Sequence, residues 1–431
     1  MKFLLLSLLL LLFTLQCYSQ VSVIIKEKNE VVYPVTPNET NDFTELFPIE
    51  KLFCDKKVVG MGEATHGTRE FFNMKVKMFK FLAMYCGFRI FSIEATYGGT
   101  LKVNDYVLYG KGDVLNAMKA MEFWTCDTEE VKDLIEWMKT ANVGRPDSEK
   151  LKFYGLDCQS FKGPADALVD YVNEFDKQNL DEFIKGLQGL NDSSDLYVYT
   201  VIPKNLPEIA RIHTIISFLQ KWFERKENLY IPASGRTKFE LARHNIENLN
   251  QTIRVRERPE LKSDFARDSC MAQNINWIYE LEKAPVFAWA HNAHIGKTPS
   301  FNKHVQRMGM FLNTLYGTAY YNIGFVFNQG SFLAYCKETK KVQECSVFRY
   351  EKNTLTNELS RAGIDAFFID LTTSDNRLFR KSAKAYNIGG GFAQEYWNRC
   401  SPAIVAKKQF DGLIFINTTT CVVPINRKLT N

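Results

Sequence analysis

Three histidines and two glutamates, whose side chains can do acid–base chemistry, lie shortly after apolar runs. Glu63 and His66 belong to the glycine-rich segment Gly62-Glu63-Ala64-Thr65-His66-Gly67, which follows a short apolar run at 58–61. His291 and His294 follow another apolar run at 285–290. An imidazole titrates near neutral pH, and a neighbouring carboxylate orients it and raises its basicity. These residue types therefore predict general acid–base catalysis in which a histidine activates water.

The apolar runs that precede these residues have the composition of buried strands. Two further runs end in acids, 89–93 before Glu94 and 151–156 before Asp157, and a helix is expected over 68–86. In open parallel sheets, ligands bind beyond the carboxyl ends of the strands. A single glycine-rich loop is more often a plain tight turn. The repetition of the pattern favours a shared site with five candidate catalytic residues: His66, Glu63, Glu94, His291 and His294.

The remaining patterns predict the rest of the fold. Strand-like runs recur at 319–327, 331–335, 342–349, 364–370 and 412–416, whereas long amphipathic helical patterns fill the region from about 163 to 283. The sequence therefore predicts a three-layer α/β/α fold with a mainly parallel sheet and a helical insert at about 163–283. Residues 20–431 are expected to form one domain that carries this insert.

The N-terminus predicts export. Residues 3–15 are almost wholly apolar and follow Met1-Lys2, and small residues precede a cut after Ser19. Residues 1–19 are therefore expected to be a signal peptide, which places the mature chain outside the cell or in the periplasm. This apolar run is too short to span a bilayer comfortably, and no later apolar stretch is long enough to cross one. We therefore expect no stable membrane insertion.

Charge and cysteine content narrow the classes of function. The net charge is +5, with both signs interspersed, which argues against a nucleic-acid partner and leaves a small molecule as the expected partner.

Nine cysteines follow residue 19, an odd number, and none has C-x-x-C spacing. Cys336 and Cys345 flank a polar stretch between two strand-like runs, which suggests a cross-strand disulfide. The oligomeric state stays open.

Several motifs, in this order, resemble the erythromycin esterase family, which includes proteins described as related to succinoglycan biosynthesis. They are the 62–67 segment, Glu94-Ala95, Trp124-Thr125, Tyr154-Gly155-Leu156-Asp157, Arg267-Asp268, Ala290-His291-Asn292-Ala293-His294 and Phe410-Asp411-Gly412-Leu413-Ile414-Phe415. The resemblance implies a hydrolase that opens a lactone or ester, such as a macrolide, without a metal or cofactor. It also implies three substrate-binding residues: Arg267, Lys75 and Trp124. Lys75 stands where many members carry an arginine, and Cys126-Asp127 interrupts the tryptophan segment.

Lactone hydrolysis needs a base, an oxyanion donor and an acid for the leaving alkoxide. We assign the base to His66, oriented by Glu63 or Glu94, and the other two roles to His291 and His294. The guanidinium of Arg267 would hold a carboxylate or polarise the carbonyl. The alternative for Arg267 is a buried ion pair with Asp268 or Asp157. The sequence has no Gly-x-Ser-x-Gly elbow, so no serine nucleophile is expected.

Two other functions remain open on sequence alone. His66, His291, His294 and a carboxylate could coordinate zinc in a metallohydrolase, although a spacing of three residues on a loop is permissive. A secreted protein that binds a ligand without turning it over is the third hypothesis. An ester and lactone screen with and without a chelator would separate these functions.

Overall fold

The computed structural model describes residues 23–25, 30–38, 40–190, 206–258, 260–299, 305–348, 354–394 and 403–425. The signal peptide expected at residues 1–19 lies outside this part of the chain, as does Cys400, and the signal peptide stays a prediction. Within the described ranges, no helix combines the length and the apolar character that a bilayer crossing requires.

A large mixed sheet forms the centre of the fold. Among the described residues, eleven strands join it, and its central strands β13, β7, β3, β6, β4 and β5 are parallel neighbours. The order along the sheet is β1 (Val23–Ile25), β2 (Glu30–Pro34), β9 (Ala366–Asp370), β13 (Gly412–Thr419), β7 (Tyr320–Cys336), β3 (Val58–Met61), β6 (Val286–Trp289), β4 (Ile90–Thr96) and β5 (Lys152–Asp157). β8 (Lys341–Val347) and β11 (Gly391–Phe392) also pair with β7, and β10 (Ala383–Lys384) pairs with β12 (Ala403–Ile404).

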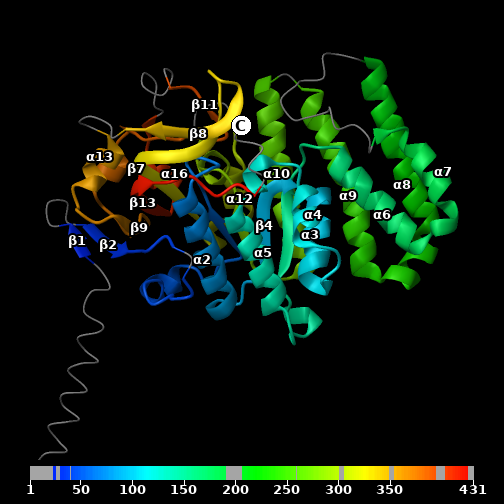
Figure 1. Cartoon of the computed structure of the whole chain (residues 1–431), viewed down its shortest axis with the longest axis horizontal. Helices are drawn as coiled ribbons and strands as arrows, with labels where there is room; N and C mark the ends of the chain where they lie inside the picture. Colours follow the sequence, from blue (N-terminus) through cyan, green and yellow to red (C-terminus); the bar gives the residue numbers. More distant parts are fainter. Residues whose placement is uncertain are drawn as a thin grey trace, which may run out of the picture.

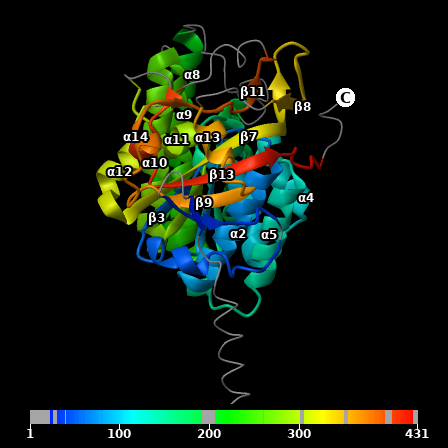
Figure 2. The same cartoon turned by 90° about the vertical axis from the view of Figure 1, so that its left-hand side faces the viewer.

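Helices cover both faces of this sheet (Figures 1 and 2). Side chains of α2 (Arg69–Tyr85) and α5 (Glu129–Ala141) share one apolar cluster with Val59 and Met61 of β3. Side chains of α10 (Glu260–Glu282) and α12 (Met308–Tyr316) share a second cluster with Val58. Successive residues of β3 therefore face opposite layers, which explains its continuous apolar sequence. The predicted α/β class with a mainly parallel sheet is confirmed.

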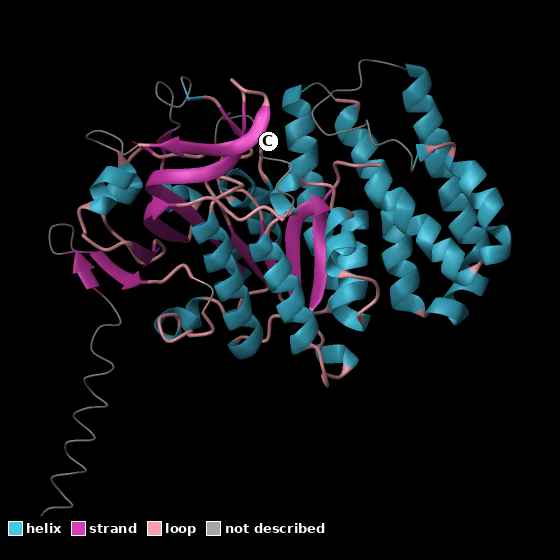
Figure 3. Cartoon of the chain, viewed as in Figure 1, coloured by secondary structure: helices cyan, strands magenta, loops and turns pink. Residues whose placement is uncertain are grey.

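The region between β5 and β6 is helical where it is described (Figure 3). It contains α6 (Lys162–Phe175), α7 (Leu180–Leu187), α8 (Leu206–Ser234), α9 (Arg236–Arg256) and α10. The first four of these share an apolar cluster of their own, away from the sheet. The other helices are α3 (Tyr97–Tyr109), α4 (Val114–Lys119), α11 (Asn292–Ile295), α13 (Leu355–Ser360), α14 (Arg377–Arg380) and α16 (Ala406–Gln409). Short 3-10 helices lie at Phe47–Leu52, Trp124–Cys126, Asp147–Glu149, Lys177–Asn179 and Gly317–Ala319.

Two strand assignments differ from the sequence prediction. The runs 319–327 and 331–335 form one continuous strand, β7, because Gln329 and Gly330 remain paired with the end of β13. Glu94 and Asp157 lie inside the last residues of β4 and β5, whereas the sequence placed them just beyond the strands. Their side chains nevertheless lie at the carboxyl ends of these strands.

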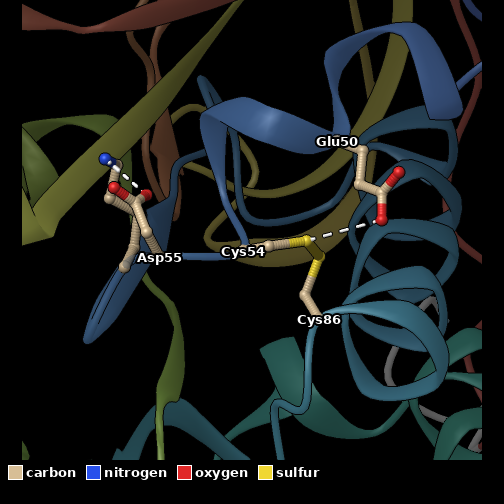
Figure 4. Close-up of a disulfide and its surroundings, with 5 residues drawn as sticks. Glu50, Cys54, Asp55 and Cys86 are labelled. Atoms are coloured by element: carbon tan, nitrogen blue, oxygen red, sulfur yellow. Dashed lines mark hydrogen bonds and ion pairs between the residues drawn. A yellow bond between two sulfur atoms is a disulfide. The ribbon is translucent and has the colours of Figure 1, made fainter.

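A disulfide between Cys54 and Cys86 links the segment before β3 to the end of α2 (Figure 4). The expected bond between Cys336 and Cys345 is wrong, because both residues are free cysteines. The hairpin register explains the error. Cys336 lies opposite Lys341, and Cys345 lies opposite Phe332, so the two cysteines are not a directly opposed cross-strand pair.

Candidate active site

The candidate catalytic residues lie at the carboxyl ends of adjacent parallel strands. In the sheet, β3 lies beside β6, β6 beside β4, and β4 beside β5. The loop after β3 carries Glu63 and His66, β4 carries Glu94, and the segment after β6 carries His291 and His294. The topology therefore brings together five residues that are up to 231 positions apart in the printed sequence. Such an edge is where open α/β sheets bind their ligands.

The glycine-rich loop is held between two neighbouring elements. A Cβ atom on Gly62 would lie 2.2 Å from Oδ1 of Asn292, whose side chain bonds the backbone of Phe325 through both of its polar atoms. A Cβ atom on Gly67 would lie 2.1 Å from the carbonyl oxygen of Leu333. Only glycine permits such close approach, which explains both glycines in this segment.

The Glu63 carboxylate lies at the centre of a buried cluster behind His66. Its Oε1 is 2.5 Å from Nδ1 of His66, and its Oε2 accepts a hydrogen bond from Trp289 at 2.9 Å and pairs with the Lys75 ammonium. Burial opposes ionisation, but the Lys75 charge and the His66 hydrogen bond hold the pKa of Glu63 at about 2. An ionised carboxylate only accepts hydrogen bonds. Nδ1 of His66 therefore carries a proton, and in the neutral ring Nε2 is free to act as a base.

Lys75 belongs to the same buried cluster as Glu63, and its expected substrate-binding role stays a prediction. Its side chain has no solvent exposure, and its ammonium lies 4.2 Å from the centre of the Trp289 ring. The reason is that α2 packs against the sheet and directs Lys75 toward Glu63. Burial lowers the pKa of Lys75 to about 8, against the opposing effect of Glu63. Lys75 therefore holds the carboxylate that orients His66.

Glu94 connects the histidines to Arg267. The pairing of β4 with β5 shifts register between Ile93 and Thr96, an irregularity that re-aims side chains next to many active sites. Glu94 Oε1 accepts a hydrogen bond from Arg267 Nη2 at 2.7 Å, and Oε2 accepts one from the backbone N–H of His291 at 2.8 Å. Burial opposes ionisation of Glu94, but the charges of His294, His66 and Arg267 hold its pKa well below the ordinary value.

Arg267 forms the buried ion pair that the sequence analysis gave as an alternative. Its Nε lies 3.0 Å from Oδ1 of Asp157, and its Nη2 lies 2.6 Å from Oδ2. The Nη1 atom is 3.2 Å from Nε2 of His294, and Arg267 also lines the cavity. The guanidinium therefore joins β5 to the site residues and keeps one nitrogen near the cavity.

His294 is the second histidine supported by a buried carboxylate. Its Nδ1 is 2.8 Å from Oδ1 of Asp268, which also accepts a hydrogen bond from the backbone of Met308 at 2.8 Å. Burial and the Arg267 charge disfavour protonation of His294, but Asp268 and Glu94 outweigh them and raise its pKa to about 9. His294 is therefore an imidazolium at neutral pH. The sequence analysis did not assign this role to Asp268.

His291 is held as a neutral ring by a different contact. It caps the short helix α11, and its Nδ1 accepts a hydrogen bond from the backbone N–H of Ala293 at 3.2 Å. Burial and the nearby His66 charge lower the pKa of His291 to about 3. The proton of the neutral ring must therefore be on Nε2, which is buried and has no hydrogen-bond partner among the described residues. The rings of His66 and His291 are 5.1 Å apart between centroids.

A cavity of about 490 Å³ opens beside Arg267, His291 and His294. These three site residues line it together with Arg307 and with four residues of the segment 387–393, which are Asn387, Ile388, Gly391 and Ala393. Trp124 is half-buried at the edge of this segment. A Cβ atom on Gly390 would lie 3.7 Å from the Trp124 ring and 3.4 Å from the His66 ring. Substrate contact by Trp124 stays a prediction.

The zinc alternative needs histidine and carboxylate atoms that converge on one point. Among the described residues, one group brings three such donor atoms together, and it consists of Glu50, Cys54 and Cys86. Both of its sulfur atoms belong to the disulfide. Among the described residues, His66, His291 and His294 form no such group.

Comparisons with known proteins agree with the fold and the motifs. The erythromycin esterase family matches residues 84–419, which include Glu94, Arg267, His291 and His294. The YbfO protein of Bacillus subtilis (strain 168) is 25% identical over 402 residues, which cover 86% of this chain and 86% of the relative. Erythromycin esterase type II of Escherichia coli is 24% identical over 326 residues, which cover 69% of this chain and 75% of the relative.

A solved structure shares the whole fold. The crystal structure of a succinoglycan biosynthesis protein superposes with a TM-score of 0.77 at 22% identity and covers 93% of this chain and 97% of its own. The family match spans most of the sequence and contains five of the candidate site residues, Glu94, Trp124, Arg267, His291 and His294. The resemblance seen in the sequence motifs is confirmed, and the chain belongs to the erythromycin esterase family.

Proposed function

We propose that the chain is a hydrolase that cleaves a lactone or another carboxylic ester of a small molecule, with His66 as the general base. Family membership supports a hydrolase. The observation that carries the proposal is the pairing of His66 with a buried, ionised Glu63, next to an N–H of His291 that has no partner among the described residues. Base, oxyanion donor and acid are the three groups that ester hydrolysis requires.

The first step is the attack of water. Because Nδ1 of His66 donates to Glu63, its Nε2 can accept a proton from a water molecule that adds to the substrate carbonyl. The ring becomes an imidazolium, and the Glu63 carboxylate stabilises that charge. Lys75 and Trp289 hold the carboxylate in place through its other oxygen.

The oxyanion and the leaving group need two further donors. The Nε2–H of His291 is buried and unpartnered in the described chain, so it loses no other hydrogen bond when it binds the developing oxyanion. His294 is protonated at neutral pH and would donate a proton to the leaving alkoxide. The two histidines thus have different protonation states because burial and the His66 charge lower the pKa of His291, whereas Asp268 and Glu94 raise that of His294.

The proposal also includes a candidate substrate and a location for the mature chain. A macrolide lactone is a candidate substrate, supported by the name of the Escherichia coli relative at 24% identity. Export to the periplasm or the medium is supported by the apolar run at residues 3–15. N-terminal sequencing of the native protein tests export, and a mature chain that starts at Met1 would contradict it.

A substrate screen tests the reaction. The purified chain is incubated with nitrophenyl esters, simple lactones and macrolides, with and without prolonged prior dialysis against a strong chelator. Hydrolysis that survives the chelator supports the histidine base, because no Lewis acid is then needed. Stoichiometric zinc with activity lost on its removal would favour the metallohydrolase instead. Binding of these compounds without any turnover would favour the non-catalytic alternative.

A further inference from the structure

Two buried thiols lie beside the residues that hold Arg267, and the proposed reaction uses neither of them. Cys158 directly follows Asp157 at the end of β5, and Cys270 lies three residues after Arg267 on α10. Both side chains are fully buried and pack in one small cluster with Val255 and Ala266. Both are free cysteines in the structure, and each thiol lies close enough to the other to shift its pKa.

The surroundings make the two thiols unequal. The Nη2 atom of Arg254 donates a hydrogen bond to the sulfur of Cys270 at 3.0 Å. The hydrogen bond from Cys158 and the contact with Arg254 lower the pKa of Cys270 to about 7, although burial opposes this. The same bond between the thiols raises the pKa of Cys158 well above its ordinary value. A thiolate beside a second thiol is the arrangement that thiol–disulfide exchange needs.

We propose that Cys158 and Cys270 form a disulfide that ties the carboxyl end of β5 to α10. The chain already contains one disulfide, between Cys54 and Cys86. Disulfides form and persist in oxidising compartments. An environment that closes the first bond can also oxidise the Cys158 and Cys270 thiols, which share one buried cluster.

The reaction consumes one molecule of a small disulfide, such as oxidised glutathione. The Cys270 thiolate attacks one of its sulfur atoms and releases the first thiolate, which leaves a mixed disulfide on Cys270. Cys158 then loses its proton, attacks Cys270 and displaces the second thiolate. The two cysteines lose two electrons and two protons, and the glutathione disulfide is reduced to two thiols. Because both cysteines are buried in the folded chain, the exchange takes place late in folding, when Arg254 already contacts Cys270 but a small disulfide can still reach its sulfur atom.

The bond would cross-link the two segments that carry the Asp157–Arg267 ion pair. It would also close a loop that contains α6, α7, α8 and α9. A disulfide that closes a long loop limits the freedom of the unfolded chain. The oxidised protein should therefore unfold at a higher urea concentration than the protein in which this bond is absent.

The test follows the covalent bond itself, so its outcome is independent of ester hydrolysis. The reduced, unfolded chain is refolded in a glutathione redox buffer poised so that the Cys54–Cys86 bond closes completely. Free thiols are then alkylated, and peptides are mapped by mass spectrometry without reduction. A peptide pair joined through Cys158 and Cys270 is expected. Molecules with the Cys54–Cys86 bond closed and with both of these cysteines alkylated would overturn the proposal.

Single variants test the order of the steps. Cys158→Ser should accumulate glutathione on Cys270, whereas Cys270→Ser should leave Cys158 largely as a thiol. Cys126→Ser is the matched control, because Cys126 is also buried and its pKa is raised to about 12 by burial. This control should still form the Cys158–Cys270 bond. Equal glutathione on both single variants would contradict the role of Cys270 as the attacking thiol.

Discussion

Replacement of Asp268 by asparagine tests whether His294 is held as an imidazolium. Asp268 is the carboxylate that contacts Nδ1 of His294, and among the groups that raise the pKa of His294 it has the largest effect. A rise in the pKa of His294 to about 9, from an ordinary value of about 6.5, corresponds to roughly 3 kcal/mol. Glu94 supplies part of this interaction and remains in the variant. We therefore expect Asp268→Asn to lower the pKa of His294 by about one to three pH units.

An NMR titration of labelled histidine measures this pKa directly, with the His294 signal assigned from a His294→Gln variant. In the hydrolysis assay, the wild-type rate should fall as the pH rises through about 9, where His294 loses its proton. The variant should lose activity at a lower pH. Asp264→Asn is the matched control, because Asp264 is an exposed acid on the same helix and also faces Arg307. An unchanged pKa of His294 in folded Asp268→Asn protein would refute the reasoning.

The remaining predictions concern the groups around His66. Lys75→Met should lower the free energy of unfolding by about 3–5 kcal/mol, because Glu63 would stay buried without its cation. Urea denaturation measures it, and a loss below about 1 kcal/mol would count against a buried ion pair. His291→Asn keeps a residue that can cap α11 but removes the Nε2–H donor. We expect its turnover number to fall by about a hundredfold to a thousandfold. A change confined to the Michaelis constant would show that His291 only binds substrate.

The location of the site was predictable from the sequence for a simple reason. Short apolar runs before Glu63 and His291 mark buried strands, and parallel strands share one carboxyl edge. Glu94 follows the same rule, even though it lies within the last residues of β4. The strand pattern, together with the rule that parallel strands share one carboxyl edge, is therefore enough to predict that these residues lie close together.

The supporting contacts were not predictable, because they depend on how distant elements pack. Lys75 lies on α2, and only the packing of this helix on the sheet shows that its ammonium meets Glu63. Asp268 follows Arg267 in the sequence, but adjacent helical residues face different directions and bind different partners. The Cys54–Cys86 bond likewise joins the two ends of the β3–α2 unit, a closeness that no cysteine spacing indicates.

The central claim is that His66 is the general base, and steady-state kinetics of His66→Ala on an ester or lactone found in the screen tests it most directly. The loss of a general base costs on the order of a hundredfold to ten-thousandfold in rate. His213→Ala is the matched control, because His213 also pairs with a glutamate, Glu257, but is half exposed on α8. We expect His66→Ala to lose at least about a hundredfold in kcat/KM while it keeps the wild-type circular dichroism spectrum, and we expect the control to keep full activity. A folded His66→Ala protein with near wild-type turnover would contradict the account and would move the base to another group, with Glu94 the next to examine.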